Sequence, residues 1–199
     1  MVTNNLTSFL YYRHKGSSTL DVVMHGGSNG INSQLITKVF EKCRKLNHST
    51  IAFNFQYLES GLENSSGPEL KEELETLQQF LDFCDYQKYK NVRLIAKSLG
   101  GIVASHYLNK LSNDEASNFS IIVLGFVTGD VTLKNFNGSI TVIQGEHDKF
   151  GGINVVKDNL KDAKSQNIKF IEIPKADHSY RNPETKEPLY EDLAIEKIN

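Results

Sequence analysis

Hydrophobic and polar residues follow two patterns along this chain. Short runs that are almost wholly apolar and rich in β-branched residues predict buried strands, and stretches with an apolar residue every three or four positions predict amphipathic helices. The strand pattern occurs at residues 9–13, 20–24, 50–55, 91–95, 119–125, 139–144 and 168–173. The helix pattern occurs at residues 35–46, 70–84, 101–111, 155–163 and 189–198. Strands and helices therefore alternate through most of the chain.

This alternation indicates the fold class. Strands that are apolar on both faces are buried between layers of helices, and each intervening helix supplies the crossover that two parallel strands require. We therefore expect an α/β fold with a mostly parallel, doubly wound sheet and helices on both faces. No repeat, low-complexity tract or linker divides the sequence, and 199 residues suffice for one full core. We expect a single domain over residues 1–199.

One helix start has a specific signal. Ser66 and Glu69 have the spacing of a capping box, with Pro68 in the position of the first helical turn. We expect this box to open the helix whose apolar stripe runs from Leu70 to Cys84.

Composition excludes several classes of function. A formal net charge of −2 argues against nucleic acid or an anionic membrane as the main partner, because both select basic surfaces. No apolar run approaches the roughly 20 residues that cross a bilayer. Residues 1–7 lack the basic and apolar regions of a secretory signal, so we expect a cytoplasmic protein. Cys43 and Cys84 lie on apolar helix faces, and we expect both to be small buried side chains.

The segment around Ser98 gives the first indication of chemistry. A strand pattern ends just before it and a helical pattern follows, so Ser98 is expected on a sharp strand-to-helix turn. Such a turn needs small neighbours, and Ala96 and Gly100 meet this need. The turn would place the backbone N–H of Leu99 and the positive end of a helix dipole where an oxyanion would form. The pattern also arises by chance, so its interpretation depends on the rest of the chain.

Two other strand ends carry the residues that such a serine needs. In a parallel sheet, ligands and catalytic groups gather at the carboxyl ends of the strands. Asp148 follows the strand that ends at residue 144, and His178 follows the strand that ends at residue 173. A serine hydroxyl attacks a carbonyl only when a neutral imidazole takes its proton, and a carboxylate must hold that imidazole in the right tautomer. We therefore expect Ser98, His178 and Asp148 to act together. Glu146 and Asp177 are neighbouring carboxylates that a misaligned loop would favour instead.

We expect no cofactor and no metal ion. His25, His147, Asp148 and His178 can be combined on paper into a metal site, but no pair of them has the short spacing typical of metal ligands.

Taken together, the segments 96–101, 25–27, 145–148 and 177–179 resemble the α/β-hydrolase superfamily, in which the triad follows the order Ser, Asp, His. Within it, the chain is similar to small members near the dienelactone-hydrolase-like group, over roughly residues 20–178. Two departures matter. Ala96 replaces the first glycine of the nucleophile elbow, and Ser98 stands where dienelactone hydrolases use cysteine, so their substrate is not carried over.

The resemblance implies further site residues. It places a second oxyanion donor in the loop after residue 24, and we assign this role to the N–H of Gly27, paired with that of Leu99. Lids in this superfamily follow the strand after the elbow helix, where residues 126–137 are too few for a helical lid. The expected substrate-binding residues are Tyr57, Lys97, Phe150 and Tyr180.

The resulting expectation is a serine hydrolase of carboxylic esters or thioesters, with a small or accessible acyl part and a small-molecule substrate. Two alternatives stay open. A non-catalytic α/β-hydrolase fold would serve as an interaction module, and an acyltransferase would use the same triad with an acceptor other than water.

Overall fold

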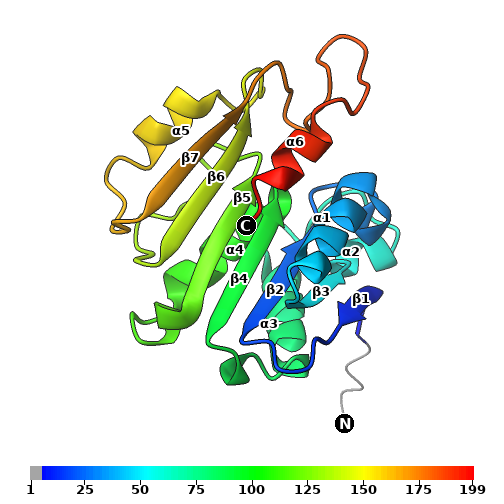
Figure 1. Ribbon diagram of the computed structural model, residues 1–199, viewed down its shortest axis with the longest axis vertical. Coiled ribbons are helices and arrows are strands. Elements are labelled where there is room, and N and C mark those ends of the chain that lie inside the picture. Colours follow the sequence, from blue (N-terminus) through cyan, green and yellow to red (C-terminus); the bar gives the residue numbers. More distant parts are fainter. Residues whose placement is uncertain (1–5) are drawn as a thin grey trace.

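A seven-stranded sheet forms the centre of the computed structural model, which describes residues 6–199 (Figure 1). Residues 1–5, part of the stretch assessed above for a secretory signal, lie outside the described residues. The strand order is β1-β3-β2-β4-β5-β6-β7, and β1 alone pairs antiparallel, with β3. The strands are β1 Phe9–Tyr12, β2 Thr19–Met24, β3 Ser49–Phe53, β4 Asn91–Lys97, β5 Phe119–Leu124, β6 Ser139–Gly145 and β7 Ile168–Ile173.

Helices cover both faces of the sheet because side chains alternate along each strand. Val22 and Met24 of β2 point into a core shared with α3, α4 and α5, whereas Val23 points into a second core shared with α1 and α6. The predicted mostly parallel, doubly wound α/β fold is confirmed. The helices are α1 Gln34–Lys45, α2 Gln56–Glu59, α3 Lys71–Phe83, α4 Leu99–Lys110, α5 Ile153–Asn159 and α6 Glu191–Glu196.

The predicted capping box at Ser66 and Glu69 is wrong. The helix α3 starts only at Lys71, after Leu70 adopts a left-handed backbone conformation that buries its side chain. Ser66 instead bonds to Glu73, seven residues on: its N–H donates to Oε1 at 2.9 Å, and its hydroxyl donates to Oε2 at 2.5 Å. The hydroxyl of Ser66 also accepts the N–H of Glu72, in the first turn of α3, at 3.3 Å.

Helix ends also differ from the pattern-based prediction. Both α5 and α6 are shorter than expected, because turns flank them at residues 160–162, 189–190 and 197. The short helix α2, at Gln56–Glu59, lies between a predicted strand and a predicted helix, where the hydrophobic pattern predicts neither. Residues 125–138 contain turns and no helix, so no lid is built there.

A buried ion pair joins neighbouring strands near their amino ends. Asp21 on β2 and Arg93 on β4 are paired in register, and the guanidinium donates to both carboxylate oxygens, at 2.6 and 2.9 Å. The Nδ1 atom of His48 lies 2.9 Å from the same carboxylate. Burial alone would raise the pKa of Asp21, but the hydrogen bonds from His48 and Arg93 outweigh it and hold this pKa below its ordinary value. The pair ties β2 to β4 at the end of the sheet opposite Ser98.

Candidate active site

Ser98 lies at the turn between the carboxyl end of β4 and the first residue of α4. Its φ of 48° is uncommon for a residue with a side chain, and such a conformation persists only where the surroundings fix it. Here the N–H of Ser98 donates to the carbonyl of Leu124, and the N–H of Gly100 donates to that of His25, each at 3.1 Å. A Cβ on Gly100 would lie 2.8 Å from the same His25 oxygen, so the close passage of α4 requires a glycine.

The serine is the first member of a chain of hydrogen bonds. Its Oγ lies 2.9 Å from Nε2 of His178, in the loop after β7. Nδ1 of His178 lies 2.7 Å from Oδ2 of Asp148, in the loop after β6. The second oxygen of Asp148 accepts the N–H of Phe150 at 2.9 Å. Because the ionised carboxylate only accepts, Nδ1 carries the proton and Nε2 is free to accept one from the serine.

Electrostatics keep His178 in the neutral form. Burial lowers the pKa of its imidazole, the hydrogen bond to Asp148 raises it, and the nearby Lys97 lowers it, with a net shift below the ordinary histidine value. A neutral imidazole at pH 7 is the form that accepts a proton as a general base.

The neighbouring carboxylates bond to their own loops. Glu146 accepts the N–H of Lys175 at 2.7 Å, and Asp177 accepts the N–H groups of Ser179 and Arg181 at 2.8 and 2.9 Å. These contacts shape the loop that carries the histidine. Of the three carboxylates considered in the sequence, Asp148 is the one that hydrogen-bonds to the ring.

Side chains from the core hold the loop after β2 in place. His25 is buried, which lowers its pKa to about 4, and its Nε2 accepts the N–H of Phe55 at 3.1 Å while Nδ1 bonds to the carbonyl of Gly26. The hydroxyl of Tyr57 donates to the same Gly26 carbonyl at 3.2 Å. The C=O and N–H of a trans peptide point in opposite directions, so the N–H of Gly27 points away from these two side chains.

Neither expected oxyanion donor is used by another backbone group. Within residues 6–199, no backbone acceptor bonds to the N–H of Gly27 or to that of Leu99, the first residue of α4. A Cβ on Gly26 would lie 3.4 Å from Cβ of Ser98, which shows how closely the glycine loop passes the serine. The glycine loop after β2 and the first residue of α4 therefore both lie beside Ser98.

Two expected substrate contacts are wrong. Tyr57 is 1% exposed and lies behind the glycine loop, where its hydroxyl binds the carbonyls of Gly26 and Gly27. Tyr180 is fully buried, and its hydroxyl donates to the carbonyl of Ile143 at 2.7 Å. Both tyrosines support the loops of the site from within the core, because their hydroxyls find backbone partners there.

The other two expected contacts lie beside the hydrogen-bonded chain. Phe150 packs its ring edge-on against His178, with centroids 4.8 Å apart. Lys97 lines the cavity at Ser98, but it is buried and its ammonium donates to the carbonyl of His178 at 2.9 Å.

A cavity of about 150 Å³ opens at Ser98, smaller than the roughly 300–1,000 Å³ of sites for drug-sized ligands. Arg181 and Glu191 line it, and the sequence analysis did not identify either. Arg181 stands three residues after His178, so its place in the same loop could have been predicted from the sequence. Glu191 enters from α6, which packs on α1 through Lys38, and no spacing in the sequence indicates this contact. The remaining lining residues are Gly26, Gly27, Ser28, Asn29, Ser33, Leu35, Ile36, Lys97, His178 and Ser179.

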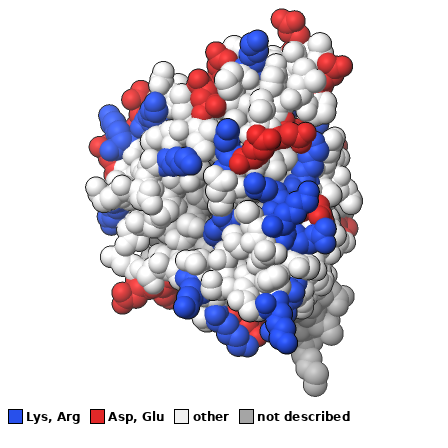
Figure 2. Space-filling model, in the orientation of Figure 1, with Lys and Arg blue, Asp and Glu red and all other residues white. Residues whose placement is uncertain are grey.

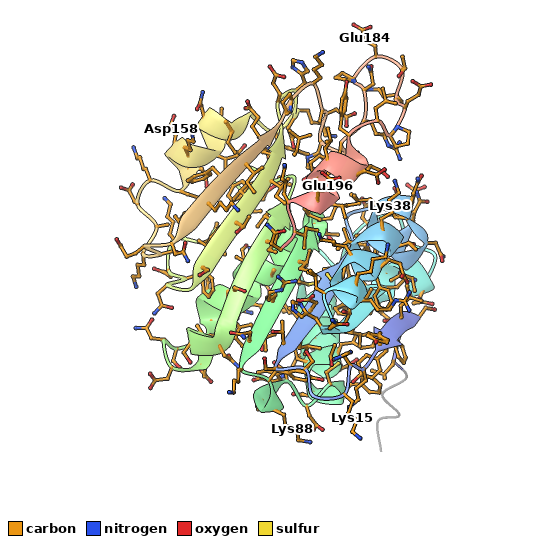
Figure 3. The ribbon with its side chains drawn as sticks, viewed as in Figure 1. Lys15, Lys38, Lys88, Asp158, Glu184 and Glu196 are labelled. Atoms are coloured by element: carbon orange, nitrogen blue, oxygen red, sulfur yellow. The ribbon has the colours of Figure 1, made fainter. Side chains whose placement is uncertain are left out.

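A larger depression, of about 520 Å³, lies at the other end of the sheet. Lys15 and Lys88 line it, and Figure 3 places both at the lower end of the molecule, far from Glu184 at the top. Figure 2 shows Lys and Arg spread over the viewed face with Asp and Glu among them, and the largest group of Lys and Arg lies at the right. Among residues 6–199, no three His, Cys, Asp or Glu side chains are grouped to hold a metal ion. No helix in this part of the chain has the length and apolar character to span a membrane.

Several solved structures have a fold similar to that of this chain. A serine hydrolase homologue from Coxiella burnetii is 18% identical, with a TM-score of 0.70 over 96% of this chain and 91% of that chain. XC6422 from Xanthomonas campestris, described as a serine hydrolase without a lid, is 17% identical, with a TM-score of 0.66 over 81% and 73%. The Pf2001 esterase from Pyrococcus furiosus is 13% identical, with a TM-score of 0.64 over 85% and 76%. These matches confirm the expected lidless α/β-hydrolase fold.

Sequence comparison identifies the family. No curated protein sequence matches this chain significantly. Residues 18–198, nearly the whole chain, match the family described as the alpha/beta hydrolase domain. The chain therefore belongs to the alpha/beta hydrolase family.

Proposed function

We propose that this protein is a serine hydrolase that cleaves carboxylic esters or thioesters through an acyl-enzyme on Ser98. The observation that carries the proposal is the hydrogen-bonded chain from Ser98 through His178 to Asp148, with distances of 2.9 and 2.7 Å. Membership of the alpha/beta hydrolase family and the likeness to an esterase support it.

In the first half of the reaction, His178 removes the proton from the hydroxyl of Ser98 as its Oγ attacks the acyl carbon. The carbonyl oxygen becomes an oxyanion, which the N–H groups of Gly27 and Leu99 stabilise, together with the amino end of α4. Asp148 holds the imidazolium that forms. His178 then gives its proton to the departing alcohol or thiol, and the acyl group stays on Ser98.

In the second half, water attacks the acyl-enzyme while His178 takes its proton. A second oxyanion forms at the same donors, and its collapse returns the proton to Ser98 and releases the acid. This cycle uses only side chains and backbone groups of the chain itself.

The cavity at Ser98 favours a small acyl group. A volume of about 150 Å³ holds only a few non-hydrogen atoms, and its walls include serine, asparagine, arginine and glutamate side chains. We therefore expect acetyl and propionyl esters to react with a higher kcat/KM than octanoyl esters, because a long alkyl chain does not fit a polar cavity of this size.

The experiment has two arms. A fluorophosphonate probe should label the wild-type protein and leave Ser98→Ala unlabelled, while both proteins melt at similar temperatures. A series of p-nitrophenyl esters and thioesters from two to eight carbons should then show decreasing kcat/KM with length. Full labelling of Ser98→Ala contradicts the assignment of the nucleophile. A folded wild-type protein that neither labels nor hydrolyses any ester supports the interaction module instead, and acyl transfer to an added alcohol in preference to water supports the acyltransferase.

A further inference from the structure

Lys97 is a buried charged group that the proposed reaction does not use. It is the last residue of β4, directly before Ser98, and its side chain points to the face of the sheet covered by α1 and α6. Only 7% of the residue is exposed. A lysine at such a position normally extends its ammonium to solvent, because burial of an unpaired charge is costly. Something in the site must therefore offset this cost.

Its ammonium lies beneath the catalytic histidine. Nζ donates to the backbone carbonyl of His178 at 2.9 Å and lies 6.0 Å from the ring centroid of Tyr180. Gly125 shows how close the ammonium of Lys97 and the imidazole ring of His178 are. A Cβ on Gly125 would lie 2.8 Å from Nζ of Lys97 and 2.9 Å from Cε1 of His178, so both groups share the space that the missing side chain leaves.

Each loop that packs against Lys97 brings titratable groups. Burial lowers the pKa of Lys97 to about 7, the carboxylates of Asp148 and Asp177 oppose this shift, and Lys149 adds to it. The groups on the loop after β6 are Asp148 and Lys149, and those on the loop after β7 are Asp177, His178 and Tyr180. Arg181 and Glu191 line the cavity at Ser98 together with Lys97.

We propose that Lys97 is a positioning residue: its ammonium fixes the backbone of the His178 loop and keeps a positive charge beside the imidazole. The carbonyl contact holds the histidine at the distance that Ser98 requires. The charge disfavours the imidazolium, so His178 stays a free base at lower pH than the carboxylate of Asp148 alone would allow. This inference rests on the proposed function, since His178 is the general base of that reaction.

The proposal predicts a specific change in Lys97→Met. Methionine fills the space of the lysine stem without the charge or the donor. The pKa of His178, followed by NMR of the labelled ring, should rise by roughly 0.5 to 1 unit, as expected for removal of a like charge a few ångströms away. The midpoint of fluorophosphonate labelling against pH should move up equally. Lys97→Arg, which keeps a charge, should stay closer to wild type, and Lys169→Met, which removes an exposed charge on β7, should change neither value.

A folded Lys97→Met in which the His178 pKa is unchanged overturns the proposal, as does an equal shift in Lys169→Met. The wild-type protein gives a second measurement if the variant does not fold. The chemical shift of the Lys97 ε-carbon should titrate near pH 7, and the chemical shifts of the His178 ring should change over the same pH range. If the ring shifts do not respond to the titration of Lys97, the proposal is also overturned. Both NMR measurements need no substrate, so they distinguish a failure of this inference from a failure of the proposed esterase activity.

Discussion

The α-carbon of Gly125 lies against the imidazole ring of His178, so closely that a Cβ there would be 2.9 Å from Cε1 and 3.0 Å from Nδ1. Gly125 follows β5, and its φ of +72° is a conformation that side chains other than glycine rarely adopt. This glycine therefore sets how near the histidine loop comes to the end of β4, although it contributes no polar side chain to the site.

Gly125→Ala should lower kcat by about a hundredfold or more, because the methyl group displaces the ring from Ser98 by a fraction of an ångström or more. Gly129→Ala is the matched control. Gly129 also has a positive φ, of 92°, but nothing lies within 4 Å of its added Cβ. Both variants should lose roughly 1–2 kcal/mol of stability from backbone strain, measured by urea unfolding. Equal kcat values for the two variants would show that the crowding at His178 has no catalytic effect.

Asp148→Asn should reduce kcat by about four orders of magnitude with little change in KM, as the corresponding change does in a serine protease where it leaves the wrong histidine tautomer. Glu146→Gln and Asp177→Asn keep an oxygen that accepts the backbone N–H groups of their loops, so they should stay within roughly tenfold of wild type. Steady-state kinetics on p-nitrophenyl acetate measures all three. If Asp177→Asn is the damaging change, the histidine is oriented by a different carboxylate.

The acid limb of kcat/KM should have a midpoint below the ordinary histidine value of 6.5, because the net effect of burial, Asp148 and Lys97 is to lower the pKa of His178. Its neutral form is the base, so activity is full above this midpoint and is lost as the pH falls through it. An unperturbed histidine base would give an apparent pKa of about 6 to 7. A midpoint at or above the ordinary histidine value of 6.5 would contradict the electrostatics of the buried ring.

Asp21→Asn should destabilise the protein by about 3–5 kcal/mol at pH 7, because it leaves Arg93 buried without its counter-charge. The pKa of Asp21 is lowered in the folded state, so its contribution is present above the unfolded value near ~4 and is lost as the pH falls through the folded value. Urea unfolding should show the gap between wild type and variant narrowing below about pH 4.

The control for this variant is Asp192→Asn. Asp192 pairs with Lys38, but its side chain is 78% exposed, so its loss should change stability by less than about 1 kcal/mol. Fluorophosphonate labelling of the folded fraction should be unaffected in both variants. A loss of labelling in folded Asp21→Asn would mean that the ion pair acts on the site at the opposite strand ends.

The sequence predicted the strands better than their connections. A strand such as β4 is recognisable by its apolar run Leu94-Ile95-Ala96, and its end fixes where Ser98 must lie. The ends of β4, β6 and β7 therefore predict that Ser98, Asp148 and His178 lie together at the carboxyl ends of the strands. The capping box at Ser66 was wrong because a local motif competes with tertiary burial, and burying Leu70 required an additional turn before α3.

The walls of the cavity were not predictable for a different reason. Tyr57 follows β3 and Tyr180 follows His178, but the direction of their side chains depends on a helical turn and on a positive-φ residue that no pattern revealed. Tyr180 itself has a φ of 58°, which turns its ring into the core. Glu191 reaches the cavity only because α6 packs on α1, a contact between segments more than 150 residues apart, as the pairing of Lys38 with Asp192 shows.

The wide separation of Ser98 and His178 in the sequence, 80 residues, has a consequence for how the chain acquires its reactivity. The two side chains meet only after β4, β5, β6 and β7 have paired in register, and such non-local parallel pairings form slowly. A refolding chain should therefore regain helical circular dichroism before it regains reactivity toward a fluorophosphonate. The rate at which labelling returns during refolding would then report when the last strands pair, which is the final step of folding.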